Sequence, residues 1–296
     1  MARGSRPDDG PQGIALVDKP SGWTSHDVVA KSRGLLGTRK VGHAGTLDPS
    51  ATGLLVLGVG RATRLLTYLS GSGKTYTGEA VLGIATSTLD AEGEVTGTWE
   101  MSGVSLAEVR AAAVGLSGDI QQVPPMVSAK KVDGRRLHEL ARAGIEIERA
   151  AVPVHVSRFE VGAAVAPGVF PVEVACSSGT YVRSLVADLG TALGGGAHLR
   201  NLRRLTVGRF DVTEAVVLDK LTPDAVLPPV AAFRGTTPVV ADDSLVDAVR
   251  HGKVLPCSSL GVTGPGPWPV VDTTGALIAV YVPHHPETTK PGVVLI

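Results

Sequence analysis

The first sixty residues alternate between short apolar runs and polar segments rich in glycine. Two apolar runs, IALV at residues 14–17 and LLVLGVG at 54–60, predict strands, and the second has the pattern of a buried strand. Between them Thr24 or Ser25 can cap a helix, because both hydroxyl groups accept hydrogen bonds from backbone amides at a helix start. Residues 37–53 follow no period, so we expect two ordered elements that frame a long loop.

Further along the chain, strand and helix patterns are mixed. Alternation and short apolar runs predict strands over residues 75–84, 126–132 and 171–177. Helical spacing predicts helices over 106–114 and 180–193, the second with one continuous apolar face. The elements do not alternate strictly between strand and helix. This favours an α+β fold, with a mixed, largely antiparallel central sheet flanked by helices, over a parallel nucleotide-binding sheet.

The pattern also suggests where domains begin and end. Residues 1–11 combine charge, glycine and proline without an apolar period, which predicts a disordered lead-in. Residues 12–230 hold the predicted α+β elements, and their last ten residues, LTPDAVLPPV, look like a connector. From 237 to 296 the apolar runs are short and separated by proline and glycine, so we expect a small β-rich second domain.

Composition supports a folded, soluble protein. The 296 residues suffice for about two domains, and 43% of them are hydrophobic, which excludes a chain disordered throughout. The two cysteines, Cys176 and Cys257, are not spaced as a metal site, and the N-terminus lacks the apolar run of a signal peptide. No window approaches 18 uninterrupted apolar residues. We therefore expect a cytoplasmic protein with no membrane segment.

Charge is balanced overall but clustered locally. The chain carries 28 basic and 28 acidic residues, so net charge points to no partner. Basic side chains nevertheless concentrate in residues 31–40, 130–142 and 200–209, whereas acidic ones gather in 90–108. Each basic cluster alone reads as a solvated surface. If all three meet on one face, they would form a surface for a polyanion such as RNA.

Three short motifs resemble common cofactor sites but are incomplete. GSGKT at 71–75 ends like a phosphate-binding loop, yet Tyr68 stands where that loop needs its first glycine. HELAR at 138–142 starts like a zinc-protease helix, yet Arg142 replaces the second histidine. GVGRAT at 58–63 lacks the last small residue of a dinucleotide fingerprint. These motifs give no support to a nucleotide cofactor or a zinc ion.

One segment remains, RKVGHAGTLDPSATGLLVLGVGRATR at residues 39–64. Asp48 precedes a proline, and Gly42 and Gly45 flank His43 in the predicted loop. An aspartate before proline is most often a turn residue. Here it lies between a basic segment and a buried strand, where a carboxylate can be held rigidly at the edge of a cleft, and local patterns go no further.

This segment closely resembles the aspartate-bearing motif of the bacterial tRNA pseudouridine-55 synthases, the TruB family. The resemblance runs in chain order over about residues 12–215. Its other motifs are VDKPSGWTS (17–25), KTYTGEAVLG (74–83), TSTLDAEGE (86–94), PPMVSAKKVDGRRLHELAR (124–142), SSGTYVRSLVADLG (177–190) and HLRNLRRLTVG (198–208). The tail over 237–296 resembles a PUA RNA-binding module and is slightly acidic.

The resemblance implies the pseudouridine synthase fold and the isomerisation of one uridine, position 55 in the T-loop of tRNA. It implies Asp48 as the catalytic aspartate, without a cofactor or metal, and leaves open whether Asp48 acts as nucleophile or base. Arg183 matches the arginine that pairs with the aspartate and is expected to lower its pKa. Tyr76 matches a tyrosine that can stack on the target base.

The same resemblance implies a set of RNA-binding residues. His43 matches the histidine that enters the T-loop and helps to displace the target nucleotide, and Asp90 matches a residue that contacts that nucleotide. Lys19 and Pro20 match a segment beneath the site. Three further cations are expected to contact phosphate: Lys40, Lys130 and Arg203. The expected partner is the T-arm stem-loop of tRNA, recognised mainly by shape, with no obligatory protein partner.

Two other functions remain open from sequence. An RNA chaperone that unfolds and refolds tRNA would need the same surface, and catalysis would then be secondary. A guide-RNA-dependent pseudouridine synthase acting on ribosomal RNA resembles this catalytic domain, but lysine-rich tails expected of such a protein are not seen here.

Overall fold

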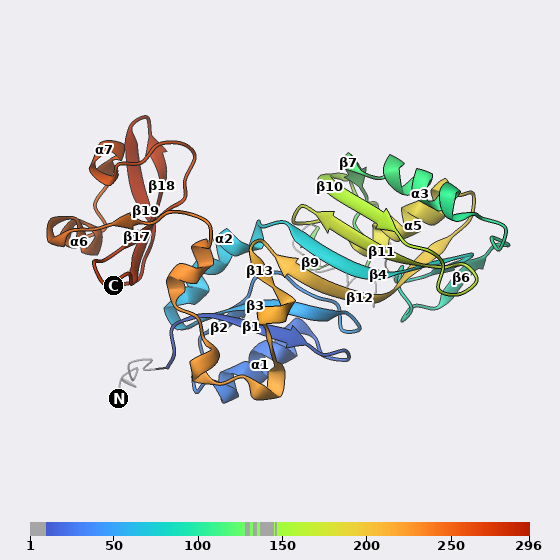
Figure 1. The fold of residues 1–296 in the computed structure, drawn as a ribbon, viewed down its shortest axis with the longest axis horizontal. Helices are drawn as coiled ribbons and strands as arrows, with labels where there is room; N and C mark the ends of the chain where they lie inside the picture. Colours follow the sequence, from blue (N-terminus) through green and yellow to red (C-terminus); the bar gives the residue numbers. More distant parts are fainter. Residues whose placement is uncertain (1–9, 128–130, 133–134, 137–144, 146) are drawn as a thin grey trace.

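The computed structural model describes residues 10–296, apart from 128–130, 133–134, 137–144 and 146 (Figure 1). Most strands of the described residues belong to two sheets. The ten-stranded sheet contains β1 (Gly13–Lys19), β2 (Val41–His43), β3 (Thr52–Val59), β4 (Lys74–Leu82), β7 (Gly118–Gln122), β10 (Val152–Val161), β11 (Val169–Cys176), β12 (Ala197–Val207), β13 (Phe210–Asp211) and β14 (Val216–Val217). The five-stranded sheet contains β15 (Val239–Val240), β16 (Leu255–Pro256), β17 (Trp268–Val271), β18 (Leu277–His285) and β19 (Thr288–Val294).

Short elements complete the described chain. Two strand pairs stand apart from the sheets: β5 (Ile84–Thr86) with β6 (Val95–Thr98), and β8 (Lys131–Val132) with β9 (Arg135–Arg136). The α-helices are α1 (Ser25–Leu35), α2 (Leu66–Ser70), α3 (Leu106–Gly115), α5 (Val182–Ala192), α6 (Asp243–Arg250) and α7 (Cys257–Leu260). The 3-10 helices are η1 (Gly60–Leu65), η2 (Val212–Glu214), η3 (Leu218–Lys220), η4 (Pro223–Ala225) and η5 (Pro229–Phe233).

The large sheet is mixed and largely antiparallel, as the sequence predicts. Its main path runs β14-β1-β3-β12-β4-β11-β10-β7, with β2 paired to β3 and β13 paired to β12. Only β1 with β14 and β3 with β12 run parallel among these pairs. Strand β12 therefore joins the half of the sheet built by β1 and β3 to the half built by β4, β11 and β10.

Helices cover the two halves separately. Helices α3 and α5 pack on the half that contains β4, β10, β11 and β12, and together they bury one hydrophobic cluster. Helix α1 contributes Val28 and Val29 to a second cluster with β1 and β3. Thr24 caps α1 through a reciprocal capping box with Asp27, which fixes where the chain leaves the loop after β1.

Most predicted elements are confirmed, two predictions need correction, and two long strands were not predicted. The stretch over 37–53 is not all loop, because β2 pairs with β3 inside it. Residues 126 and 127 form a bend rather than a strand, and 128–130 lie outside the described residues, so only β8 remains of the strand expected over 126–132. The long strands β10 and β12 were not predicted as strands. Of the lead-in over 1–11, residues 1–9 lie outside the described part.

The five-stranded sheet forms the small C-terminal β-rich unit expected from the sequence, and it shares a core with the large sheet. Ile14 and Leu16 of β1 belong to the same buried cluster as Val293 and Leu295 near the C-terminus. Arg64 also donates a hydrogen bond of 2.6 Å to the carbonyl oxygen of Val294. The connector after β14 follows β1, where Ile14 and Leu227 exchange two backbone hydrogen bonds. No helix among the described residues is long and apolar enough to cross a bilayer.

Candidate active site

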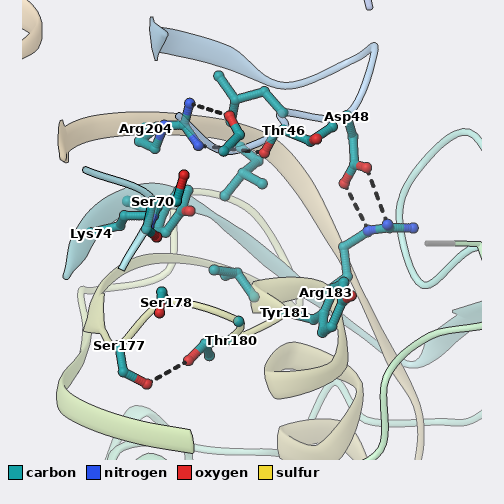
Figure 2. A pocket seen from close by; sticks show the side chains of 16 residues that line it. Thr46, Asp48, Ser70, Lys74, Ser177, Ser178, Thr180, Tyr181, Arg183 and Arg204 are labelled. Carbon is teal, nitrogen blue, oxygen red and sulfur yellow. Dashed lines mark hydrogen bonds and ion pairs between the residues drawn. The ribbon is translucent and has the colours of Figure 1, made fainter. Parts of the chain in front are cut away.

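A pocket of about 260 Å³ opens where the two halves of the large sheet meet (Figure 2). Its wall includes the loop between β2 and β3, the turn before β4, the loop before α5 and the middle of β12. The lining residues that the argument below uses are Asp48, Lys74, Tyr76, Arg183 and Arg204. Sequence segments separated by more than 130 residues therefore contribute to one site.

Asp48 and Arg183 form an ion pair at this pocket. The Nε atom of Arg183 lies 3.0 Å from Oδ2 of Asp48, and its Nη2 atom donates a hydrogen bond of 3.2 Å to Oδ1. The Arg183 side chain is 5% exposed, whereas 36% of the Asp48 side chain is exposed. The carboxylate is thus held from one side by a buried guanidinium and stays open to the pocket on the other.

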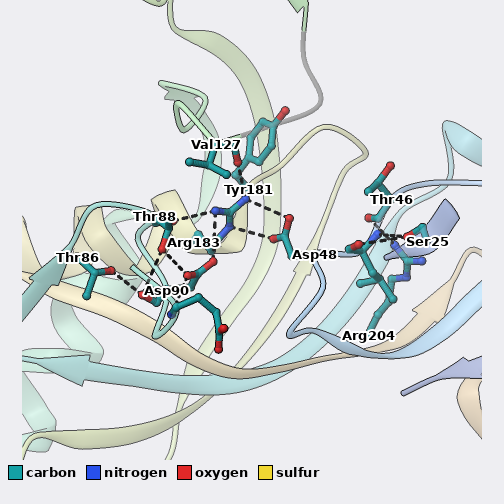
Figure 3. A network of polar contacts seen from close by, with 12 residues as sticks. Ser25, Thr46, Asp48, Thr86, Thr88, Asp90, Val127, Tyr181, Arg183 and Arg204 are labelled. Atoms are coloured by element: carbon teal, nitrogen blue, oxygen red, sulfur yellow. Dashed lines mark hydrogen bonds and ion pairs between the residues drawn. The ribbon is translucent and has the colours of Figure 1, made fainter. Parts of the chain in front are cut away.

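Arg183 itself is fixed by three further groups (Figure 3). It donates hydrogen bonds of 2.8 Å to the carbonyl oxygens of Thr88 and Val127. Its Nη1 atom also lies 3.3 Å from Oδ2 of Asp90, a carboxylate that is only 14% exposed. A planar guanidinium can satisfy several acceptors in fixed directions, so Arg183 cannot rotate away from Asp48 without breaking other contacts.

The pKa of Asp48 corrects one expectation from the sequence. Arg183 does lower the pKa of this carboxyl, as predicted, but burial raises it by more, and the nearby Asp90 carboxylate raises it further. The net result is a pKa above the usual value of 3.8. Arg183 therefore limits the effect of desolvation rather than producing an unusually acidic aspartate.

Tyr76 lies on β4 with 8% of its surface exposed and lines the same pocket. Burial raises the pKa of its hydroxyl, and a hydrogen bond with Arg204 acts in the opposite direction. At neutral pH the hydroxyl therefore stays protonated. The structure brings together the three residues expected to be catalytic, since Asp48, Tyr76 and Arg183 all contribute to one pocket wall.

His43 lies at the end of β2, two residues before the pocket lining begins at Gly45. Its ring meets the ring of His26 edge to face, with centroids 5.4 Å apart. Burial is the main reason that the pKa of His43 is lowered, and its Nδ1 atom is buried without a hydrogen-bond partner among the described residues. The lowered pKa favours a neutral imidazole ring beside the loop that carries Asp48.

The expected RNA-binding residues differ in their surroundings. Lys19 has no exposed surface, and its Nζ atom donates to the carbonyl oxygens of Pro20, Trp23 and Pro49 at 2.9, 2.6 and 3.0 Å. Burial lowers the pKa of Lys19 to about 8. Lys19 thus supports the loop from beneath, where RNA cannot touch it, while Pro20 is exposed.

The three expected phosphate contacts also differ. Lys40 is exposed. Arg203 is engaged in two hydrogen bonds of 3.0 and 2.8 Å with the carboxylate of Asp18, so a carboxylate compensates its charge. Lys130 lies outside the described residues. Asp90 reaches the site through Arg183 and lines a second hollow of about 130 Å³ next to the main pocket.

Sequence reasoning missed several polar residues around the pocket. Arg204 and Ser25 are buried and bind the backbone of the loop that carries Asp48. Lys74 also lines the pocket, and burial lowers its pKa to about 8. The described ranges contain no cluster of three or more histidine, cysteine, aspartate or glutamate side chains suited to a metal ion.

Comparison with known proteins assigns this chain to a class, the pseudouridylate synthases. The model described as the TruB family pseudouridylate synthase N-terminal domain matches residues 33–182. A second model, the tRNA pseudouridylate synthase B C-terminal domain, matches residues 183–227. The chain belongs to the TruB family, which confirms the resemblance found in the sequence.

Curated relatives match along most of the chain. The tRNA pseudouridine synthase B of Rhodococcus jostii is 51% identical over 277 residues, covering 90% of this chain and 89% of the relative. That of Streptomyces coelicolor is 47% identical over 283 residues, covering 93% and 94%. Among solved structures, a Cbf5-Nop10-Gar1 complex contains a chain with a TM-score of 0.71 and 26% identity, covering 92% of this chain and 78% of that one. This structural likeness confirms the expected fold.

Proposed function

We propose that this protein isomerises uridine to pseudouridine in the T-loop of tRNA, at position 55, with Asp48 as the catalytic carboxylate. The observation that carries the proposal is the Asp48 carboxylate, which Arg183 holds at the rim of a pocket that Tyr76 also lines. Family membership supports the reaction, and relatives named tRNA pseudouridine synthase B support tRNA as the substrate.

The reaction rearranges two bonds without a net change in composition. The bond from N1 of uracil to C1′ of ribose breaks, and a bond from C5 to C1′ forms. C5 then loses its proton, and N1 gains one. An ionised carboxylate can serve either as a nucleophile on the sugar or as the base that starts the rearrangement, and both roles need it within reach of the ribose.

The surrounding residues have separate tasks in this proposal. Arg183 keeps the carboxylate charged and oriented despite burial. The face of Tyr76 offers a stacking surface for the detached base, which must not diffuse away before it turns. The target must leave the T-loop to reach Asp48, and the neutral His43 ring beside the catalytic loop can replace the stacking that the RNA loses.

A direct experiment uses unmodified tRNA without any guide RNA. We expect pseudouridine at position 55 after incubation with the wild-type protein, and none in a tRNA with cytidine at that position. Asp48→Asn should lower the single-turnover rate by at least about a thousandfold and leave tRNA binding within about twofold, because shape and volume are kept. Asp119→Asn is the matched control, since that exposed carboxylate contacts His155 on another part of the sheet and does not line the pocket.

The outcomes separate the alternatives. Normal turnover by Asp48→Asn would contradict the catalytic assignment. If wild-type protein and Asp48→Asn refold tRNA equally well while no pseudouridine forms, the chaperone function is the better description. A requirement for an added guide RNA would instead align the protein with the H/ACA RNP that contains a structural relative at 25% identity.

A further inference from the structure

Polar side chains from outside the catalytic loop bind nearly every backbone carbonyl of that loop. The loop is defined here as residues 45–49, and these side chains come from α1, β1 and β12. Figure 3 shows two of them, Ser25 and Arg204, beside Thr46. They are Arg204 at Gly45 and Thr46, Ser25 at Leu47 and Lys19 at Pro49. The carbonyl of Asp48 accepts from the amide of Ala51 at 3.2 Å.

Arg204 is the largest of these groups and is fully buried. It donates hydrogen bonds of 2.7 Å to Leu54, 3.2 Å to Gly45 and 3.4 Å to Thr46, in each case to the carbonyl oxygen. No carboxylate of a described residue forms an ion pair with it. A buried guanidinium without a carboxylate is unfavourable unless its N–H groups are satisfied, and here loop and strand carbonyls satisfy them.

The position of Arg204 follows from strand register. In the sheet Arg204 lies opposite Tyr76 on β4 and opposite Gly53 on β3. Its guanidinium therefore touches the Tyr76 hydroxyl and the catalytic loop at once. Its neighbour Arg203 turns to the other side, as alternation along a strand requires, and pairs with Asp18.

Ser25 holds the next residue of the loop. Its hydroxyl donates to the carbonyl of Leu47 at 3.1 Å and accepts from the amide of Leu47 at 2.9 Å. The hydroxyl is buried, so water does not compete for either bond. Leu47 directly precedes Asp48, and its backbone therefore sets the direction in which the carboxylate leaves the chain.

We infer that Arg204 and Ser25 are positioning residues for the isomerisation, which place the Asp48 carboxylate and the Tyr76 hydroxyl in one fixed arrangement by binding the backbone of residues 45–47. This inference rests on the proposed function. Neither side chain needs to touch the reacting atoms. A displacement of about 1 Å in a reacting group can lower a rate about a hundredfold, so a small shift of this loop is sufficient to reduce turnover.

The test compares Arg204→Lys and Ser25→Ala with Arg158→Lys as the matched control, because Arg158 lies on β10 of the same sheet and pairs with Glu173 outside the pocket. For each protein, the single-turnover rate on tRNA, the Kd for tRNA and the thermal unfolding midpoint are measured. We expect Arg204→Lys to lose about a hundredfold in rate and Ser25→Ala about tenfold, with Kd within about twofold of wild type. Arg158→Lys should keep the wild-type rate.

A purely structural role predicts a different result. The unfolding midpoints of the variants would fall, but their single-turnover rates, measured at temperatures well below those midpoints, would equal the wild-type rate. That result, or an equal rate loss in Arg158→Lys, would overturn the inference. If Arg204→Lys does not fold, Ser25→Ala decides, because it removes a single oxygen atom. A wild-type protein that makes no pseudouridine would refute the proposed function instead, so the two failures are distinguishable.

Discussion

The carboxylate of Asp48 and the guanidinium of Arg183 meet side by side although 135 residues separate them in sequence, with one pair of atoms 3.0 Å apart and the other 3.2 Å apart. Arg183 also lies 3.3 Å from the carboxylate of Asp90. One guanidinium therefore faces two carboxylates. Asp48 is the more exposed of the two, at 36% against 14% for Asp90, and it lines the pocket.

Arg183→Lys should lower the single-turnover rate by about a hundredfold while the protein still binds tRNA. A lysine keeps the charge but is a point donor, so it cannot hold both carboxylate oxygens and the carbonyl groups of Thr88 and Val127 together. The measurement is the rate with saturating protein, together with Kd. A variant with wild-type rate would show that the second contact to Asp48 is dispensable.

The single-turnover rate should rise with pH in the acidic range and fall again in the basic range. Burial raises the pKa of Asp48 above 3.8, and since the reaction needs the ionised form, the rate should rise with pH through this elevated value. Lys19 has a pKa of about 8, so above that pH it loses one of the protons that bind three carbonyl oxygens, and the rate should fall.

Lys74 also lines the pocket and has a pKa of about 8, so it needs a control. In Lys74→Gln the decline above pH 8 should remain if Lys19 causes it. Single-turnover rates between pH 5 and 10 at constant ionic strength measure both limbs. A decline that disappears in Lys74→Gln would move the assignment from Lys19 to Lys74.

Salt dependence of tRNA binding should separate two of the expected phosphate contacts. The sequence alone predicts that loss of Lys40 or Arg203 weakens binding and flattens the salt dependence. The Asp18 carboxylate already neutralises Arg203, so Arg203→Ala should change the slope of log K against log salt by less than the roughly 0.9 expected for the loss of one uncompensated phosphate contact. Lys40→Ala should change it by about 0.9 if the ammonium contacts one phosphate.

Kd values measured at four or more salt concentrations give the slopes. Asp18→Asn should act in the opposite direction, because it leaves the Arg203 charge uncompensated. Identical slopes for wild type and Lys40→Ala would place Lys40 off the interface.

Gly53→Ala should destabilise the protein by about 3 kcal/mol or more. The φ angle of Gly53 is +100°, and a Cβ atom would lie 2.2 Å from the backbone oxygen of Arg204. Gly34 in helix α1 is the matched control, because a Cβ atom there meets nothing within 4 Å. Gly34→Ala should stabilise by up to about 1 kcal/mol.

Urea unfolding of the two variants tests this contrast. Equal free energies of unfolding for wild type and Gly53→Ala would mean that β3 and β12 can move apart at this point without a loss of stability. Rate measurements on folded Gly53→Ala add a second readout, since the change pushes on the residue that supports the catalytic loop.

Local sequence patterns were enough to predict the elements that are marked by neighbouring residues, such as a helix cap, a helical apolar face or an alternating strand. The Thr24 cap and the apolar face of α5 are such signals. Strand β12 was read as a basic cluster because HLRNLRRLTVG carries three arginines, yet its central position buries Arg204 completely. Strand β2 has only three residues, too few to show an alternating pattern in the sequence. It is a strand because it pairs with β3.

The site shows the same division. From residue patterns alone, Asp48 could be recognised only as a carboxylate suited to a cleft edge, and its grouping with Tyr76 and Arg183 came from the resemblance to a family. Arg204 and Ser25 gave no signal, because their loop partners lie between 22 and 159 residues away in sequence. Such contacts depend on sheet register, which the sequence does not display locally.

The buried cluster that joins β1 to the C-terminal strand has a consequence for synthesis in the cell. Ile14 and Leu16 are synthesised well before Val293 and Leu295, against which this cluster closes. Strand β1 must therefore wait with part of its apolar face uncovered until those residues have been made. A chain cut short before Val293 would keep that apolar face exposed.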